Sequence, residues 1–516
     1  MKQKLKEWSS KKFTPGITML APYLIIAGIS FIFWECVDTD SYYMMAQGKS
    51  ILEHGIPEFN THTFHENFRI VVQQYPYCVL EYLASLVPRN IGLWAMMLSQ
   101  AMLLFHLVRK WIEKHTPDKW VSTLAAMLIC TTTNIGYFYS LRPENLTLIL
   151  LLLECEAIER YRDRNEKKWL IALPVLAFLE ANLHGSMWPF HLCVFAAYAV
   201  PAVWPKNGIA KNPIADDHVK WRPEFLAAGA SMVPAMLLNP YGLEMLLYPI
   251  KSMRVFKFVP IMEQKNTTFM TQYGMMNVAM IIVLALLIYT KRAKSTTVWM
   301  SLGFLFLSCV NYHCSMFIPI AQCFLIGDAL AAYEDRKPAR TSDLIPNGIK
   351  LLVWSATGLC MLYAAYSLAF TVQDRAGQPA LEPAASYIAE NQGEGENVFN
   401  NLDIGSMLLY YGVTGIHSDS RPELMLKSIN GQWDAWAEYS WFRNGLVAPL
   451  EIERYGSVQG YMDANNIQFI VDTFQNPAFP YLQGWLADNP DWVKAELHDP
   501  EGTGVFSVWI RADRKK

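Results

Sequence analysis

The chain has 516 residues, of which 52 % are hydrophobic and 17 % are charged, and its formal net charge is −3. Its mean hydropathy is +0.13, and apolar runs of membrane length recur through the first two-thirds of the sequence. This composition excludes an ordinary soluble enzyme and indicates a polytopic α-helical membrane protein.

About eleven transmembrane helices are expected, several of them short enough to need flanking residues to complete the crossing. The predicted spans are 17–36, 91–107, 120–138, 146–158, 169–183, 187–204, 225–238, 275–289, 298–310, 316–329 and 351–370. The first run should remain as a membrane anchor, because Trp34, Glu35 and Cys36 end it without a small-residue cleavage pattern.

Basic residues orient these spans, since they gather before the first span and in every second connection. Cytoplasmic loops of membrane proteins carry such an excess of Lys and Arg. We therefore expect a cytoplasmic amino terminus in a multi-pass protein of the cell membrane. With an odd number of spans, everything after residue 370 lies outside.

The part of the chain after residue 370 has 20 Asp and Glu against 10 Lys and Arg, so an acidic external region gives no support to nucleic-acid binding. Short apolar runs predict strands at 397–401, 416–418, 467–472, 492–497 and 505–510, and helices at 383–390, 404–411 and 450–465. We therefore expect a transmembrane domain over 1–372, with a first outer loop at 37–90, and an extracytoplasmic α/β domain over 373–516.

Polar residues gather at the predicted outer ends of the spans. They are Asp38, Asp40, Arg142-Pro-Glu144, Asn182-Leu-His-Gly185, Asn239-Pro-Tyr-Gly242 and Glu263. Ionisable groups at a membrane edge are costly unless they meet water, a partner or a substrate. One outward-facing active cavity accounts for all of them together.

These pieces resemble a known family. Asp38-x-Asp-x-Tyr-Tyr, Gly48, Gly55-Ile-Pro57, Arg142-Pro143, Asn182-Leu-His-Gly185 and Asn239-Pro-Tyr-Gly242 look like the bacterial integral-membrane C-type (GT-C fold) glycosyltransferases, relatives of the protein mannosyltransferases. The resemblance implies transfer of a sugar from a polyprenyl-phosphate donor to an extracytoplasmic glycan, lipid or protein of the cell envelope. Membrane lipids are then a further partner.

The resemblance places the catalytic acid of the first outer loop at Asp38, with Asp40 in the position of a second acid. A carboxylate within hydrogen-bond reach can take the proton of an acceptor hydroxyl, and direct displacement would invert the sugar carbon. Helix capping is the alternative, because Asp40 can accept from the amides of Tyr42 or Tyr43. The two acids can also hold a divalent cation, Mg or Mn, so metal dependence stays open.

Donor or substrate binding is expected from Arg142, Glu144, Asn182, His184, Asn239, Tyr241 and Glu263. Arg142 can grip a phosphate by a bidentate contact, but interfacial snorkelling explains it as well. His184 can donate to the leaving group or to a sugar hydroxyl, or have a structural role. Glu263 lies in a basic, aromatic loop that suits a lipid phosphate and equally suits a plain interface.

One position departs from the family pattern. Asn60 stands where relatives often carry an acid after the Gly-x-Pro turn, and His62 and His65 follow it. A zinc pair at these histidines is weakly supported without a third ligand, so solvated loop histidines are expected. The departure keeps open an inactive relative that binds surface glycans, and a lipid-linked glycan transporter or flippase is the other alternative.

Overall fold

In a computed structural model, the protein folds into two compact units. The structure describes residues 15–33, 37–132, 135–203, 223–259, 266–268, 270–335, 354–355, 357–363, 365–366, 378–419, 421–446, 454–473, 478–497 and 505–514. Unit 1 comprises Met1–Cys36, Val87–Leu246 and Ile261–Ala369, and unit 2 comprises Val37–Leu86, Leu247–Pro260 and Phe370–Lys516. The first outer loop thus clusters with the carboxy-terminal part of the chain, while the domain boundary at 372 remains a prediction.

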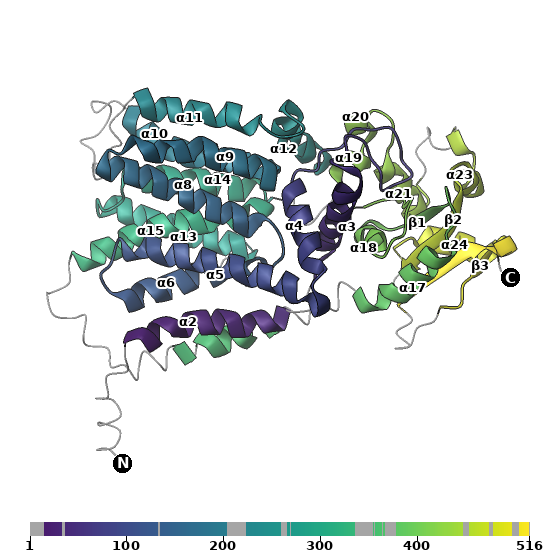
Figure 1. The fold of residues 1–516 in the computed structure, drawn as a ribbon, viewed down its shortest axis with the longest axis horizontal. Helices are drawn as coiled ribbons and strands as arrows, with labels where there is room; N and C mark the ends of the chain where they lie inside the picture. Colours follow the sequence, from purple (N-terminus) through teal and green to yellow (C-terminus); the bar gives the residue numbers. More distant parts are fainter. Residues whose placement is uncertain are drawn as a thin grey trace, which may run out of the picture. The chain divides into compact units, whose positions relative to one another are not determined.

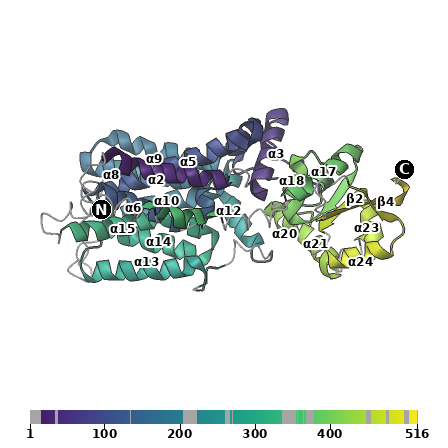
Figure 2. The same ribbon diagram turned by 90° about the horizontal axis from the view of Figure 1, so that it is seen from below.

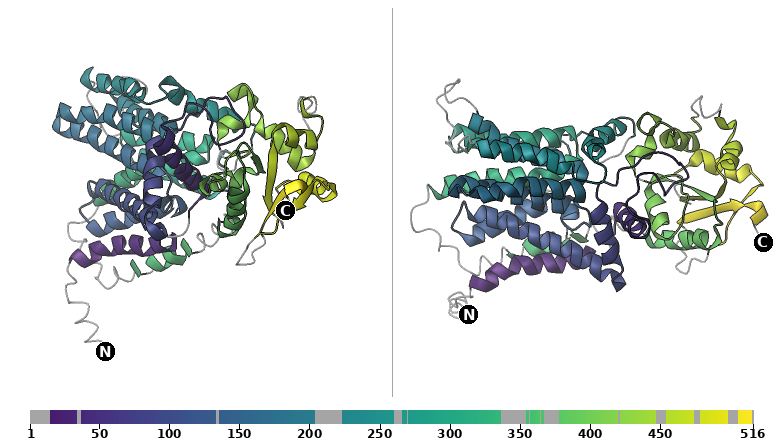
Figure 3. Two further views of the ribbon diagram at one scale, coloured as in Figure 1. Left: turned by 45° about the vertical axis from the view of Figure 1, so that its right-hand side comes forward. Right: turned by 45° about the horizontal axis from the view of Figure 1, so that its top comes forward.

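Unit 1 is a bundle of helices that run alongside one another (Figures 1 and 2). Its longer helices are α2 (Pro15–Ser30), α5 (Ile91–Glu113), α6 (Lys119–Thr132), α8 (Glu144–Arg164), α9 (Ala172–Leu183), α10 (Trp188–Val203), α11 (Pro223–Met236), α13 (Gln272–Tyr289), α14 (Ser295–Val310) and α15 (Ile318–Glu334). Helix α5 contacts α2, α6 and α8, and α14 contacts α10, α13 and α15. Figure 3 shows the same side-by-side arrangement from two further directions.

Helices occupy the described residues of the predicted spans between 17 and 329 except 237 and 238, which follow the end of α11. Much of the last predicted span, 351–370, lies outside the described residues. By length and composition, Pro88–Glu113 and His313–Glu334 can cross a membrane, and four shorter apolar helices accompany them. Leu24, Leu286 and Phe306 are 62 %, 57 % and 68 % exposed. Apolar side chains pointing outward from a helix bundle are typical of lipid-facing surfaces. The number of crossings stays a prediction.

Unit 2 contains a four-stranded mixed sheet. Its strands are β1 (Asn397–Asn400), β2 (Ile467–Thr473), β3 (Trp492–Lys494) and β4 (Phe506–Arg511), in the order β1-β2-β4-β3. The β1–β2 pair is parallel, and the other two pairs are antiparallel. Four of the five strand predictions are confirmed. The fifth, at 416–418, is only an isolated bridge in which Ile416 faces Val398 and Thr63.

Helices surround this sheet in unit 2. They are α3 (Thr39–His54), α4 (Tyr75–Ser85), α17 (Gln378–Asn391), α18 (Leu402–Tyr410), α19 (Pro422–Met425), α20 (Lys427–Asn430), α21 (Ala435–Asn444), α23 (Val458–Ala464) and α24 (Pro480–Asp488), and α12 (Leu243–Val255) has residues in both units. Helix α17 contacts β4, and α23 contacts β2. A buried aromatic cluster that includes Phe399, Phe442, Tyr461 and Phe479 forms the core between sheet and helices. Burying each such ring stabilises the fold by about 1.5–3 kcal/mol.

Gly48 lets helices α3 and α4 pack closely side by side (Figure 1). A Cβ atom at residue 48 would lie 2.1 Å from the backbone oxygen of Cys78. No side chain fits at that distance, so the packing of these two helices depends on glycine at this position.

Candidate functional site

The first acid of the Asp38-x-Asp sequence is the N-cap of helix α3. Asp38 has extended backbone angles, and its Oδ1 accepts a hydrogen bond from the Ser41 amide at 2.9 Å. Asp40 lies in the first turn of the helix, and both acids are partly exposed. Capping was the alternative considered for the two acids, and Asp38 is the one that provides the cap. The cap uses one carboxylate oxygen and fixes the direction of the group, which is compatible with a role as base.

The two acids do not complete a cation site on their own. Within the described parts of the chain, neither Asp38 nor Asp40 belongs to a cluster of three acidic, histidine or cysteine ligands. Magnesium and manganese favour several oxygen ligands in near-octahedral geometry. Magnesium is usually held by one or two carboxylates together with waters and substrate phosphates, so metal dependence stays a prediction, and no chemical step is assigned to a metal here.

A second polar centre of unit 2 surrounds Arg421. Its Nε donates to both carboxylate oxygens of Asp419 at 2.9 Å, and its Nη2 donates to Asn60 Oδ1 at 2.6 Å. The guanidinium also lies 5.8 Å from the centre of the Tyr43 ring. Burial raises the pKa of Asp419, but Arg421 outweighs burial and holds that pKa below its usual range. The centre is a buried ion pair with a satisfied carboxylate.

Asn60 binds Arg421 as an acid at this position could, and it also donates hydrogen bonds to the backbone of its own loop. Its carbonyl oxygen accepts from Arg421, while its amide donates to the backbone oxygens of Thr63 at 3.1 Å and His65 at 2.6 Å. An acid has no amide hydrogen to donate. The departure from the family pattern therefore stabilises the loop that contains it.

The two loop histidines are held in different ways. His62 is partly buried, and its Nε2 lies 2.8 Å from Gln47 Oε1. Burial and the nearby Arg421 lower the pKa of His62 to about 4. His65 is completely buried, so the expectation of a solvated histidine is wrong for this residue.

In unit 1, Arg142 and Glu144 flank the start of helix α8. The Arg142 guanidinium lies 5.5 Å from the centre of the Tyr137 ring and is partly exposed. Glu144 is buried, and its Oε1 lies 3.5 Å from Nε2 of His313. His313 is not among the expected site residues, because it is isolated between two predicted spans. Its position adds an imidazole to the polar end of α8.

His184 is one end of a buried hydrogen-bonded chain. Its Nδ1 lies 2.8 Å from the Thr147 hydroxyl, which donates to Glu180 at 2.7 Å. Because that hydroxyl has only one hydrogen, His184 Nδ1 is the donor of the first bond.

The chain continues inside the bundle to His191 and Glu154. Nε2 of His191 lies 3.3 Å from Glu180, and its Nδ1 lies 2.5 Å from Glu154. All three side chains are fully buried. The chain connects helices α8, α9 and α10, and sequence reasoning missed it because the partners are up to 37 residues apart.

Asn182, Asn239 and Tyr241 shape a local turn in unit 1. The Asn182 amide donates to the backbone oxygen of Leu238 at 3.2 Å. The Asn239 side chain accepts from the Tyr241 amide at 2.8 Å and donates to the Met236 oxygen at 2.6 Å. These bonds are structural, and substrate binding by the three residues stays a prediction. Glu263 lies outside the described residues.

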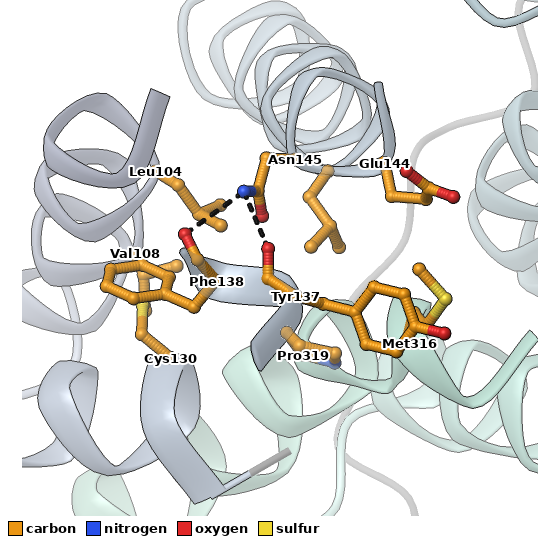
Figure 4. Close-up of a pocket in the computed structure, with 10 residues that line it drawn as sticks. Leu104, Val108, Cys130, Tyr137, Phe138, Glu144, Asn145, Met316 and Pro319 are labelled. Atoms are coloured by element: carbon orange, nitrogen blue, oxygen red, sulfur yellow. Dashed lines mark hydrogen bonds between the residues drawn. The ribbon is translucent and has the colours of Figure 1, made fainter. Parts of the chain in front are cut away.

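Two of the cavities among the described residues of unit 1 differ in size and lining. The first has a volume of about 20 Å³ and is lined in part by Tyr137, Glu144 and Asn145 (Figure 4). The Asn145 amide crosses it to donate to the backbone oxygens of Tyr137 and Phe138 at 2.9 and 3.2 Å. This volume holds about one water molecule and no sugar. The second, of about 430 Å³, is lined mainly by apolar residues between Ala21 and Ile29 and between Trp354 and Leu362.

The chain has a GT-C-like fold, as the sequence resemblance implied, because its structure matches a solved structure of this kind over most of its length. The chain is similar in structure to ArnT from Cupriavidus metallidurans in its apo state, with a TM-score of 0.54, 11 % sequence identity, and coverage of 94 % of this chain and 97 % of that one. At this identity the likeness establishes the fold. No protein-family model matches the sequence, and no curated protein matches it.

Proposed function

We propose that this protein is a membrane glycosyltransferase that moves a sugar from a polyprenyl-phosphate donor to an extracytoplasmic glycan, lipid or protein. The observation that carries the proposal is the fold match over 94 % of the chain. The outward-facing apolar side chains of unit 1 support a membrane location.

Asp38 is the proposed base of a single inverting displacement. The acceptor oxygen forms a bond to the anomeric carbon while the bond from that carbon to the phosphate oxygen breaks. The polyprenyl phosphate leaves with the electron pair, and the acceptor proton passes to the Asp38 carboxylate. A partly exposed carboxylate held by a backbone amide suits this task, because its direction is fixed.

Arg142 and His184 are the proposed donor-phosphate ligands. Arg142 is partly exposed and has a planar fork of donors that matches phosphate oxygens. His184 directs its Nδ1 hydrogen to Thr147, so Nε2 donates to a phosphate oxygen only in the protonated ring, and in the neutral ring it accepts from a sugar hydroxyl of the donor. Asp40, Glu144, Asn182, Asn239, Tyr241 and Glu263 remain proposed neighbours of the substrates.

The test is transfer of radiolabelled sugar from a panel of polyprenyl-phosphate donors by purified protein in lipid. Asp38→Asn removes the base and keeps the cap, because Asn caps helices as well as Asp does. We expect turnover to fall by about 10²- to 10⁴-fold. Asp434→Asn is the matched control, because Asp434 caps α21 in the same unit by accepting from the Ala437 amide at 3.0 Å.

Equal turnover in Asp38→Asn would remove Asp38 from the mechanism. Absence of turnover with every donor would favour a lipid-linked glycan transporter or an inactive glycan-binding relative. A second measurement distinguishes these two. Movement of labelled lipid-linked glycan across vesicles identifies a transporter, and retention of glycan without movement or transfer identifies a binding protein.

A further inference from the structure

We propose that His65, His417 and Glu438 form a structural zinc site inside unit 2. Their ligand atoms all lie within 4.8 Å of one another, and they form the one such cluster found among the residues that the structure describes. This site is distinct from Asp38 and from the polar end of α8, and the inference does not depend on the proposed transferase activity.

The two histidines and Tyr461 converge on one carboxylate oxygen, Oε2 of Glu438. Nε2 of His65 lies 2.8 Å from Glu438 Oε2, and Nε2 of His417 lies 3.1 Å from the same oxygen. The Tyr461 hydroxyl also lies 2.7 Å from it. A carboxylate oxygen has two lone-pair positions, so three groups converging on it exceed its capacity as an acceptor. A cation placed among the four groups relieves this crowding, since every one of them offers it a lone pair.

The donor set suits zinc. Two imidazole nitrogens, one carboxylate oxygen and the Tyr461 oxygen as a fourth neighbour make a four-coordinate N/O environment. Zinc binds carboxylates in their charged form and imidazoles in their neutral form.

The surroundings indicate a structural ion. The side chains of His65 and His417 are 0 % exposed, and that of Glu438 is 1 % exposed. The Phe64 ring is 4.5 Å from the His65 ring, and the Phe399 ring is 4.5 Å from the His417 ring, measured between centroids. A site closed by aromatic rings leaves no position for a substrate, which is the mark of a structural zinc centre.

The ligands come from segments far apart in the sequence. His65 belongs to the first-loop segment, His417 follows the bridge to β1, Glu438 lies on α21, and 373 residues separate His65 from Glu438. An ion held only by the folded arrangement stabilises it by mass action. Zinc would therefore join the first-loop segment to the carboxy-terminal segment of unit 2.

The first experiment measures metal in the full-length protein. We expect about one zinc per chain by inductively coupled plasma mass spectrometry after purification from zinc-containing medium. Replacement by Co²⁺ should give visible absorption bands of a four-coordinate site. Removal of zinc by a chelator should lower the thermal midpoint, and added zinc should restore it. Wild-type protein with no stoichiometric zinc and no Co²⁺ bands would overturn the proposal and leave a purely hydrogen-bonded cluster.

Variants then locate the ion. Glu438→Gln and His417→Gln keep the size and hydrogen-bonding ability of the side chains, and each should lose the bound zinc. Asp472→Asn is the control, because Asp472 is a buried carboxylate of β2 that accepts from the Ala478 and Phe479 amides at 2.9 and 3.2 Å. Zinc retained at one per chain in Glu438→Gln and His417→Gln would place the ion elsewhere and refute this site. The wild-type measurement decides the matter even if a variant fails to fold.

Discussion

The Asp38 carboxylate accepts a hydrogen bond from the Ser41 amide at 2.9 Å, so the proposed base is also the cap of helix α3. Substitutions at this residue should therefore separate capping from chemistry. Asp38→Ala should lower the free energy of unfolding by about 1 kcal/mol, and Asp38→Asn should leave it nearly unchanged. Denaturant unfolding of the purified protein measures both, and equal losses in the two variants would argue that the charge stabilises the fold.

Gly48→Ala should weaken the packing of α3 against α4. The new Cβ would lie 2.1 Å from the Cys78 backbone oxygen, and overpacking of this kind typically costs about 1–3 kcal/mol. Gly484→Ala in α24 is the matched control, because nothing lies within 4 Å of a Cβ there. In a helix this control should stabilise by roughly 0.5–1 kcal/mol. Similar midpoints for the two variants in a thermal unfolding experiment would refute the packing argument.

The stability of unit 2 should fall on acidification through the titration of His62. Its folded pKa of about 4 lies below its ordinary value of 6.5, so between these values the unfolded chain binds the extra proton. The contribution of His62 to the free energy of unfolding is fully present above pH 6.5 and is lost as the pH falls toward 4. His62→Gln should flatten this part of the stability profile, which denaturant titrations at a series of pH values can follow. An unchanged slope between pH 6.5 and 4 would assign the dependence to other groups.

Thr147→Val should impair both the fold and the orientation of His184. The substitution keeps the shape but leaves Glu180 and His184 without their shared hydroxyl, and each buried unsatisfied group costs about 1–3 kcal/mol. We expect a higher KM for the donor together with lower stability, and Thr147→Ser should recover both. Thr131→Val is the control, since the Thr131 hydroxyl donates only within its own helix, to the Met127 oxygen at 2.7 Å. A normal KM in Thr147→Val would show that this hydrogen-bonded chain has no part in donor binding.

Arg421→Leu should be among the most destabilising changes in unit 2. It leaves the buried Asp419 carboxylate without its cation, and breaking a buried pair in this way costs about 3–5 kcal/mol. The double variant Arg421→Leu with Asp419→Asn should recover part of the loss, because no uncompensated charge remains. A double-mutant cycle by denaturant unfolding measures the coupling, and additive losses would contradict it.

The strands of unit 2 could be predicted because each is a short apolar run bounded by polar residues, as at 467–472. The isolated bridge of Ile416 could not be separated from them, since a single paired residue has the same local sequence as a strand end. Helix α21 was not predicted because Trp436, Trp441 and Phe442 favour strands by propensity. In the structure they form a helix that packs against the aromatic core.

The site was predictable only where its residues lie close together in the sequence. Asp38 and Asp40 stand out after the first apolar run, but the sequence does not tell which acid caps the helix, because both precede available amides. The pairings of His65 with Glu438 and of Asn60 with Arg421 join positions 373 and 361 residues apart. No local pattern contains such pairings, and they appear only when the fold is known.

Unit 2 draws its first segment from Val37–Leu86 and its last from Phe370–Lys516, which has a consequence for biogenesis. Ribosomes add about 5–20 residues per second, so the intervening residues 87–369 take roughly 15–60 s to synthesise. During that interval the first-loop segment has emerged without Arg421, His417 or Glu438. It must be kept from aggregating until translation is nearly finished, and a nascent chain released before residue 370 would lack the carboxy-terminal partners of this segment, among them Arg421 and Glu438.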